Sequence, residues 1–252
     1  MLLFGVNFNA YYFILFGNAR KAFKMEEVRC YFIIVAVSVA VITIELFRSA
    51  VPFANALRDS SFQVASIITT TGFSTADFNL WSGTSRTILV MLMFVGACAG
   101  STGGGMKVSR FVILFKTVFK ELDSYIHPKR IQKLSLDGKP IEHDVVRSIN
   151  VYFITFTVIF AASLLLVSLE GKDLVTNFTA VAATINNIGP GLELAGPTQN
   201  FVHFSILTKY VLMFDMLAGR LELFPLLILF HPAVWRDIHT THRRWKIKRM
   251  EE

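Results

Sequence analysis

The chain has 252 residues, 53% of them hydrophobic, with a mean hydropathy of +0.52. Its 24 phenylalanines lie in long apolar runs, which is typical of a membrane protein and argues against a large soluble core. The net charge of +7 would also suit a nucleic-acid-binding protein. The basic residues lie beside the apolar spans, however, which favours membrane topology. The two cysteines, Cys30 and Cys98, imply no disulfide framework.

Four long apolar spans are predicted as helices. Residues 30–47 form the first, which is long enough to cross about one bilayer core. Residues 86–119 form the second, and a straight helix of that length, roughly 50 Å, is too long unless it is tilted or broken. Its middle carries the stretch "GACAGSTGGGMK", residues 96–107, where a break is expected because glycine is costly inside a helix. The third span is 149–169, and the fourth, 201–230, is again interrupted, at Gly219, Arg220 and Pro225.

Two similar segments connect these spans in pairs. Each holds a short amphipathic run, too short to cross a membrane, followed by a tract rich in Thr or Asn and a glycine. Asp59 is expected to cap the first short helix and Asp173 the second. The chain therefore reads as an internal repeat with a period of about 120 residues.

The tracts "TTTGFST", residues 69–75, and "TINNIGPG", residues 184–191, follow the two short helices. Non-helical backbone at membrane depth is tolerated only where it is buried in protein or lines a water-filled path. The C-terminal end of a short helix is partially negative, and carbonyls of a following loop can replace a cation's hydration shell. Gly72 permits backbone angles that expose such a carbonyl. An ordinary outer loop is the alternative, and the second copy of the pattern argues against it.

Most of the 25 lysines and arginines lie before the first span, between the break in the second span and the third span, or after the fourth. These segments are therefore predicted to be cytoplasmic, so that both glycine tracts enter from outside. The basic tail, 236–252, reads as a positive-inside flank in preference to a lipid- or nucleic-acid-binding segment.

Four strings in this order, "TTTGFST", "GSTGGGMK", "NNIGPG" and "GRLELFPLL", resemble the Trk/Ktr/HKT superfamily of potassium transporters, most closely its bacterial TrkH/KtrB branch. The resemblance covers nearly the whole chain and implies an all-α polytopic membrane protein of M1-P-M2 repeats with re-entrant pore helices. The expected units are 1–29, the end of a preceding repeat plus a linker; 30–120, a repeat with a broken second helix; 121–144, a cytoplasmic loop; 145–235, a second repeat; and 236–252, a cytoplasmic tail.

The resemblance also implies potassium ion transport in a bacterial cell membrane, with K⁺ at the filter as the only metal, no other cofactor and no enzymatic role. The implied filter residues are Thr70, Thr71, Gly72, Phe73, Asn186, Asn187, Ile188 and Gly189. The implied gate is the loop Gly100, Ser101, Thr102, Gly103, Gly104 and Gly105, with Arg220 beneath the filter.

Two alternatives to the gate come from the residues themselves. A close contact between helices explains Gly96 and Gly100 but not three consecutive glycines. A phosphate loop requires Gly-Lys-Ser/Thr, whereas Lys107 follows Met106. For Arg220, the alternatives are bracing the loop by donating to its carbonyls, or a salt bridge to Asp215 or Glu222.

Family members carry four repeats around one pore, and this sequence matches only the third and fourth, with the last piece of the second. Either the chain is a fragment, or a second copy or a partner chain completes the ring. The resemblance further implies a homodimer and a cytoplasmic nucleotide-binding subunit of the RCK type, similar to TrkA or KtrA, docking on the 107–147 region and the tail. Nucleic acid is not an expected partner. The competing functions are a non-conducting half-subunit and an ion-coupled secondary transporter.

Overall fold

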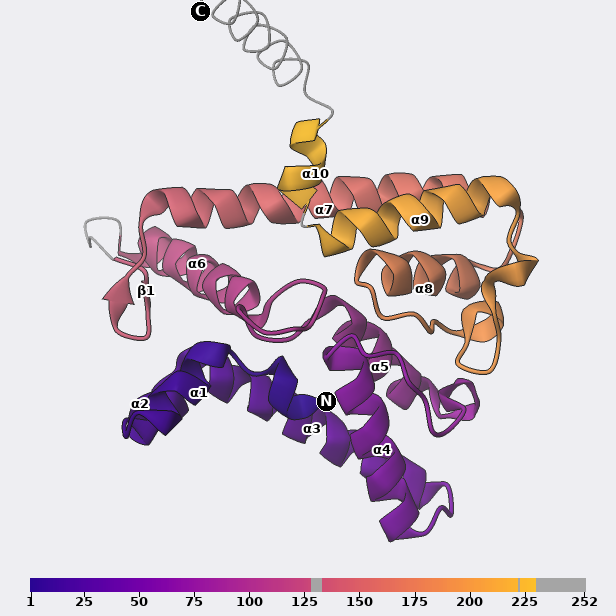
Figure 1. Ribbon diagram of the computed structural model, residues 1–252, viewed down its shortest axis with the longest axis horizontal. Coiled ribbons are helices and arrows are strands. Elements are labelled where there is room, and N and C mark those ends of the chain that lie inside the picture. The colour runs from indigo at the N-terminus through magenta and orange to yellow at the C-terminus, as the bar shows by residue number, and fades with distance from the viewer. Residues whose placement is uncertain (128–132, 222, 230–252) are drawn as a thin grey trace, which may run out of the picture.

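The computed structural model describes residues 1–127, 133–221 and 223–229. Apart from one short hairpin, their regular secondary structure is helical (Figure 1), which confirms the all-α class. Residues 1–24 precede the first long helix and form a 3₁₀ turn, Leu2–Gly5, and two short helices. The helices are α1 (Phe8–Leu15), α2 (Ala19–Lys24), α3 (Glu26–Arg48), α4 (Phe53–Ile68), α5 (Gly83–Phe94), α6 (Val108–Ile126), α7 (His143–Ser168), α8 (Leu174–Ile185), α9 (Ile206–Arg220) and α10 (Leu223–Leu229).

Each half of the chain places a short helix against longer ones. In the first half α4 packs on α3 and α5, and in the second α8 packs on α7 and α9. The exposed side chains of α4 lie near its start, while its last residues, Gln63–Ile68, are all buried. Helix α8 is buried along most of its length. The short helices therefore point their C-terminal ends into the protein.

The interruption predicted in the span 86–119 is confirmed. The one predicted at Gly219, Arg220 and Pro225 is present but displaced, because Gly219 and Arg220 end α9 and Pro225 lies within α10. The span 86–119 consists of α5 and α6, separated by the non-helical residues 95–107, which we call the glycine loop. The span 201–230 consists of a 3₁₀ turn at Phe201–His203, then α9, and α10 after a break at residue 221. Unbroken helices α3 and α7 cover the two other predicted spans.

One of the two expected caps is correct. The Asp173 carboxylate accepts hydrogen bonds from Val175 N at 3.1 Å and Thr176 N at 2.9 Å, as an N-cap does. The prediction for Asp59 is wrong, because α4 begins earlier, after Pro52, and Asp59 instead accepts from the guanidinium of Arg58.

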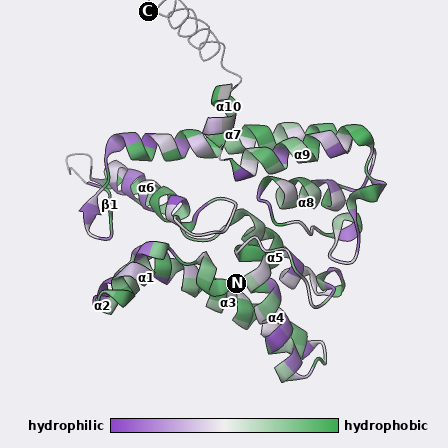
Figure 2. Ribbon diagram, viewed as in Figure 1, coloured by the Kyte–Doolittle hydropathy of each residue, from purple (hydrophilic) through white to green (hydrophobic). Residues whose placement is uncertain are grey.

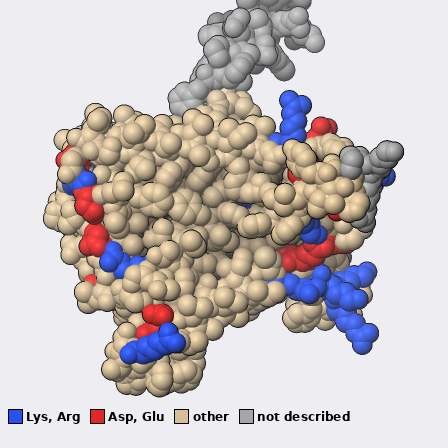
Figure 3. Space-filling view, turned by 180° about the vertical axis from the view of Figure 1, so that it is seen from behind, with Lys and Arg blue, Asp and Glu red and all other residues tan. Residues whose placement is uncertain are grey.

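The surface has the character expected of a membrane protein. Helices α3 and α7 are long and apolar enough to cross a bilayer, and Figure 2 shows hydrophobic residues along most of α7. Side chains of both helices, such as Ile33, Val37 and Leu165, are exposed. In the face seen in Figure 3, charged side chains gather toward the ends of the molecule and leave a band between them almost free of charge. Such a band matches lipid hydrocarbon between two polar interfaces.

A short hairpin in the 121–144 region was not predicted. Strands β1 (Ser135–Leu136) and β2 (Lys139–Pro140) are joined by Asp137 and Gly138, both at positive φ, as a two-residue hairpin turn requires. The Asp137 carboxylate accepts from Glu26 N, at the start of α3, at 2.6 Å. Lys116 of α6 binds both the Glu26 carboxylate and the Ser135 carbonyl. Segments predicted to be cytoplasmic thus meet on one side of the molecule.

Phenylalanine rings join the two halves. Phe94, at the end of α5, contacts Phe156 and Phe160 of α7 and Phe178 of α8, with ring centroids 5.5–6.4 Å apart. Aromatic pairs at this separation stabilise packing beyond the area they bury. The end of α5, just before the glycine loop, is therefore fixed against the second half.

The cap at Asp173 predicts a pH-dependent stability difference. Hydrogen bonding from the Thr176 backbone, more than any other contact, lowers the pKa of Asp173. The ionised cap therefore stabilises the fold above its unfolded pKa, near 3.8, and this contribution is lost as pH falls through the lower folded value. Asp173→Ala should cost about 1 kcal/mol at pH 7 and lower the melting temperature, with a smaller difference below pH 4.

Asp59→Ala is the matched control, because Asp59 caps no helix, and it should shift the melting temperature much less than Asp173→Ala. Melting curves in detergent at pH 7 and at acid pH measure both effects. Equal shifts for the two variants would contradict the assignment.

Candidate functional site

The first candidate filter segment is a tight turn at the end of α4. Thr70 has a φ of 53° and Gly72 a φ of 81°, so the chain enters the left-handed region twice within three residues. Thr70 N donates to Ile67 O at 3.0 Å and Thr71 N to Ser66 O at 2.8 Å. A β-branched residue at positive φ is uncommon and marks a strained site.

The second candidate segment repeats this turn residue for residue at the end of α8. Asn187 has a φ of 56° and Gly189 a φ of 109°. Asn187 N donates to Thr184 O at 3.0 Å and Ile188 N to Ala183 O at 2.8 Å, which are the same sequence offsets as in the first turn. The internal repeat expected from the sequence is therefore present in the backbone geometry.

Both turns leave their carbonyls available. Within the part of the chain that the structure describes, no hydrogen bond ends on the carbonyl oxygens of Thr70–Gly72 or of residues 187–189. Buried or half-buried backbone carbonyls are normally paired. Two turns that each present unpaired carbonyls have the composition of a cation-coordinating surface.

The two turns lie in direct contact. A Cβ built on Gly72 would overlap the carbonyl oxygen of Ile188, so only glycine fits there. Phe73, which follows, is 70% exposed, and its carbonyl accepts from the Ser66 hydroxyl at 2.5 Å. The structure thus brings together the predicted residues of both repeats, while the side chain of Phe73 points away from the buried parts of the turn.

The glycine loop lies against both turns. Gly104 N donates to the hydroxyl of Thr70 at 2.7 Å, which supports the strained conformation of that residue. A Cβ on Gly104 would come within 3.1 Å of Asn186 O and 3.4 Å of the Asn187 Cβ. The predicted gate residues and predicted filter residues are therefore neighbours, and there is no room for larger residues between them.

The loop is ordered by hydrogen bonds within its own length. Gly96 N donates to Met106 O at 2.7 Å, Val108 N to Ala97 O at 3.2 Å, and the Ser101 hydroxyl to Cys98 O at 2.6 Å. Lys107 Nζ binds Gly103 O. Because Gly96 and Gly100 lie outside any helix, the helix-contact alternative for these glycines is wrong.

The loop is also held from the N-terminal segment. Cys98 N donates to Gly5 O at 2.9 Å, Thr102 N to Phe4 O at 3.3 Å, and Phe8 N to Gly100 O at 3.1 Å. The hydroxyl groups of Ser101 and Thr102 also bind backbone carbonyls, those of Cys98 and Phe4 respectively.

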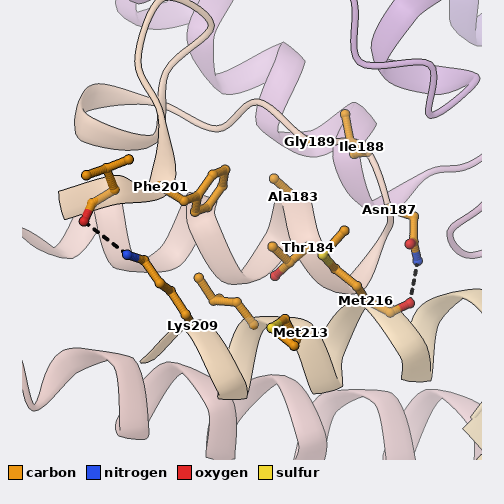
Figure 4. Close-up of a pocket in the computed structure, with 11 residues that line it drawn as sticks. Ala183, Thr184, Asn187, Ile188, Gly189, Phe201, Lys209, Met213 and Met216 are labelled. Carbon is orange, nitrogen blue, oxygen red and sulfur yellow. Dashed lines mark hydrogen bonds between the residues drawn. The ribbon is translucent and has the colours of Figure 1, made fainter. Parts of the chain in front are cut away.

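Helix α9 approaches the second turn through Gly219. A Cβ there would overlap the carbonyl oxygen of Ile185. The Asn187 side chain donates to Met216 O at 3.1 Å, and a cavity of about 530 Å³ lies between the turn and α9, lined by Met213, Met216 and Lys209 among others (Figure 4). Lys209 itself donates to Val202 O at 3.2 Å.

Arg220 is the last residue of α9 and its side chain is exposed. Among the described residues it forms no hydrogen bond or ion pair. The Asp215 carboxylate is buried and accepts from Ser163 at 2.6 Å, so the alternative salt bridge of Arg220 to Asp215 is not formed. Bracing of the glycine loop by Arg220 is likewise not formed, and Glu222 lies outside the described residues.

The loop that holds Asn79 contacts the loop that holds Glu193, and no pattern in the sequence predicted this contact. Asn79 receives a hydrogen bond from Glu193 N at 2.9 Å and donates to Glu193 O at 3.4 Å, while the Glu193 carboxylate binds Arg86. Glu193 itself has a φ of 51°. Nothing local in the sequence marks these residues, because their partners lie more than 100 positions away.

The family model described as TrkH, cation transport protein, matches residues 10–236. The chain belongs to the TrkH family of cation transport proteins. The Trk system potassium uptake protein TrkH of Salmonella typhimurium is 33% identical over 243 residues, covering 94% of this chain and 49% of the relative. The TrkH of Vibrio parahaemolyticus is 39% identical over 184 residues, or 73% of this chain and 37% of the relative.

A solved structure shows the same fold. The crystal structure of the potassium transporter TrkH from Vibrio parahaemolyticus superposes with a TM-score of 0.84 at 34% identity, over 93% of this chain and 51% of that one. The chain therefore spans about half the length of the relatives it matches. Its apolar outer surface is that of a membrane protein.

Close packing at Gly219 predicts that this position accepts no side chain. Gly219→Ala should lower stability by about 1–3 kcal/mol, because the methyl group must displace the backbone at the end of α8. Gly83→Ala is the matched control, since Gly83 is exposed at the start of α5 with no atom within 4 Å of its Cβ position. Melting curves in detergent should show a loss for Gly219→Ala only, and a similar loss for both would contradict the packing argument.

Proposed function

We propose that this chain supplies two of the repeats that line a potassium-conducting pore. The observation that carries the proposal is the pair of turns at the ends of α4 and α8, which share the same hydrogen-bond offsets, leave carbonyls unpaired among the described residues, and lie in contact where Ile188 O packs against Gly72. Membership of the TrkH family, whose relatives here are potassium uptake proteins, supports K⁺ as the ion.

In this proposal Thr70–Phe73 and residues 186–189 are filter elements. Each short helix directs its partially negative C-terminal end toward the turn, which favours a cation there. Carbonyl dipoles then replace the hydration shell of K⁺ as it passes. On this basis we assign α3–α4–α5/α6 and α7–α8–α9 as two M1-P-M2 units with re-entrant pore helices.

The glycine loop, with Gly100–Gly105, is the proposed gate. Its contact with Thr70 and the backbone of Asn186 supports this assignment, because a loop beside both turns can block a path that they line. Backbone without side chains can both obstruct a narrow path and move out of it, because glycine has wide conformational freedom. Arg220, exposed and unpaired among the described residues, places a fixed positive charge near the same path and opposes cation passage.

Two repeats present only part of a filter ring. We propose that the remaining filter segments come from an additional part of the same chain, from a second copy or from a partner chain. The relatives, which are about twice this length, have room for them in one chain. In a bacterial plasma membrane we expect a homodimer and an RCK-type nucleotide-binding subunit on the side of the hairpin and α6. The C-terminal tail, 236–252, which is also expected to bind this subunit, lies outside the described residues.

A rival proposal is a half-subunit that does not conduct, and another is an ion-coupled secondary transporter. The first predicts no contribution to flux in any assembly. The second predicts saturating transport that depends on a coupled ion gradient, whereas a pore conducts without one.

Uptake of ⁸⁶Rb⁺ into proteoliposomes, with K⁺ and Na⁺ as competitors, tests the proposal. One preparation holds this chain alone, and the other holds it together with the first half of the Salmonella typhimurium relative. We expect uptake, blocked by K⁺, in at least one preparation, and the one that conducts identifies what completes the ring. Absence of uptake in both would reject the pore function.

Replacing Gly72 should damage selectivity. Gly72→Ser imposes a side chain at a φ of 81° and pushes it against Ile188 O, which displaces carbonyls of both turns. In the conducting assembly, the permeability ratio of K⁺ to Na⁺ should fall by about tenfold or more. Gly171→Ser is the control, because Gly171 has a similar φ of 69° but no atom within 4 Å. Unchanged permeability ratios for Gly72→Ser would refute the filter assignment.

Removing the charge of Arg220 should raise flux without changing selectivity. Arg220→Gln keeps a polar side chain and removes the positive charge that opposes entry of a cation. We expect a several-fold faster ⁸⁶Rb⁺ uptake with an unaltered ratio of K⁺ to Na⁺ competition. Lys209→Gln, on the same helix but bonded to Val202 O, should leave flux unchanged. Slower flux for Arg220→Gln would contradict the electrostatic role.

A further inference from the structure

The carboxylate of Glu27 is buried in the first turn of α3, with 4% of the residue exposed. Its neighbour Glu26 is half-buried and binds Lys116 and, through its backbone N–H, the hairpin. Acidic residues in the first turn of a helix are common because they complement the helix dipole, so the sequence alone marks neither of them. Burial of a carboxylate is rare, and it requires specific partners.

Three segments far apart in the chain donate hydrogen bonds to Glu27. One carboxylate oxygen accepts from Ala99 N, in the glycine loop, at 2.5 Å and from Ser109 N, in the first turn of α6, at 3.2 Å. The other accepts from the side chain of Asn7, just before α1, at 3.3 Å. Glu27 is therefore a junction between the N-terminal segment, the glycine loop and α6.

The bond to Ser109 has a second effect. Helix α6 has no side-chain cap from its own N-cap residue, Lys107, because a lysine side chain has no oxygen that could accept from the N–H groups of the first turn. The carboxylate of Glu27, supplied from α3, takes that place. A negative charge at a helix N-terminus is favoured by the partial positive charge there, so the charge of Glu27 stabilises the point where the loop re-enters a helix.

We infer that Glu27 is the positioning residue of the glycine loop, and that its ionised carboxylate holds residues 95–107 in the conformation seen here. Its importance for gating rests on the proposed function, whereas its hold on the loop does not. Neither the filter nor the gate residues expected from the sequence include it.

The chain carries its own reporter for this inference. Cys98 is fully buried and adjacent to Ala99, whose N–H Glu27 binds. A thiol reagent reaches Cys98 only when the loop opens. Cys30 is the other cysteine, it is partly exposed, and Cys30→Ser leaves Cys98 as the single thiol.

The test measures the rate of Cys98 alkylation by a maleimide, in proteoliposomes, in the Cys30→Ser background. Glu27→Gln keeps the size of the side chain and removes its charge, and charged partners make the stronger hydrogen bonds. We expect alkylation on the order of tenfold faster than with Glu27, and faster still for Glu27→Ala, which removes both acceptor oxygens.

Glu26→Gln is the matched control, because Glu26 is next in sequence but bonds only outside the loop, and it should leave the rate unchanged. Equal alkylation rates with Glu27 and with Gln or Ala at that position would overturn the inference. An equal rise for Glu26→Gln would also overturn it, since the effect would then be general loosening of α3. If Glu27→Ala fails to fold, the alkylation rate of the nearly isosteric Glu27→Gln alone tests the inference.

The ⁸⁶Rb⁺ assay separates this inference from the proposed function. In a conducting assembly, Glu27→Gln should raise flux together with the alkylation rate. Faster alkylation with unchanged flux would uphold the clamp on the loop and contradict the gate role of the loop.

Discussion

The structure depends on one constraint, that backbone leaving a helix in apolar surroundings must find its hydrogen bonds inside the protein. The chain leaves helical structure at the end of α4, between α5 and α6, and at the end of α8. The backbone groups of the glycine loop form hydrogen bonds between its two ends, with the N-terminal segment and with Glu27. In the two turns the N–H groups donate to carbonyls of the preceding helix, and the carbonyls of the turns themselves have no hydrogen-bond partner among the described residues. Carbonyls without partners are a cost to folding and the means of binding a cation.

These solutions make the two repeats interdependent. Position 72 accepts only glycine because Ile188 O lies against it. Gly104 N supports the strained Thr70, and Gly219 lets α9 reach the end of α8. Close packing of backbone on backbone leaves little room for adjustment, since packed interiors shift between discrete arrangements more readily than they deform. A movement of the loop is therefore felt at Thr70, and the turn at Thr70 touches its counterpart in the second repeat.

The sequence predicted what is decided locally. Three consecutive glycines at 103–105 strongly disfavour a helix there, and Asp173 precedes a run that begins abruptly after a glycine and a lysine. Asp59 failed as a cap because the residues before it, from Phe53 on, continue the helix back to Pro52. Glu27 and the pair Asn79–Glu193 were missed because their roles come from partners distant in the chain. Periodicity and capping rules carry no information on such contacts, whereas the repeated turn, being local, was visible twice.

The N-terminal residues restrain the glycine loop more than their position before the first long helix suggests. Three backbone bonds join residues 4–8 to the loop, at Gly5–Cys98, Phe4–Thr102 and Phe8–Gly100, and Glu27 adds a fourth contact at Ala99. Each such bond contributes about 1 kcal/mol net, more where the acceptor is charged, so the loop is held by a few kcal/mol in total. An equilibrium of that size is within the range that differential binding of a ligand or partner can shift. Anything that moves residues 4–8 relative to α3 therefore acts on the loop directly, without passing through either turn.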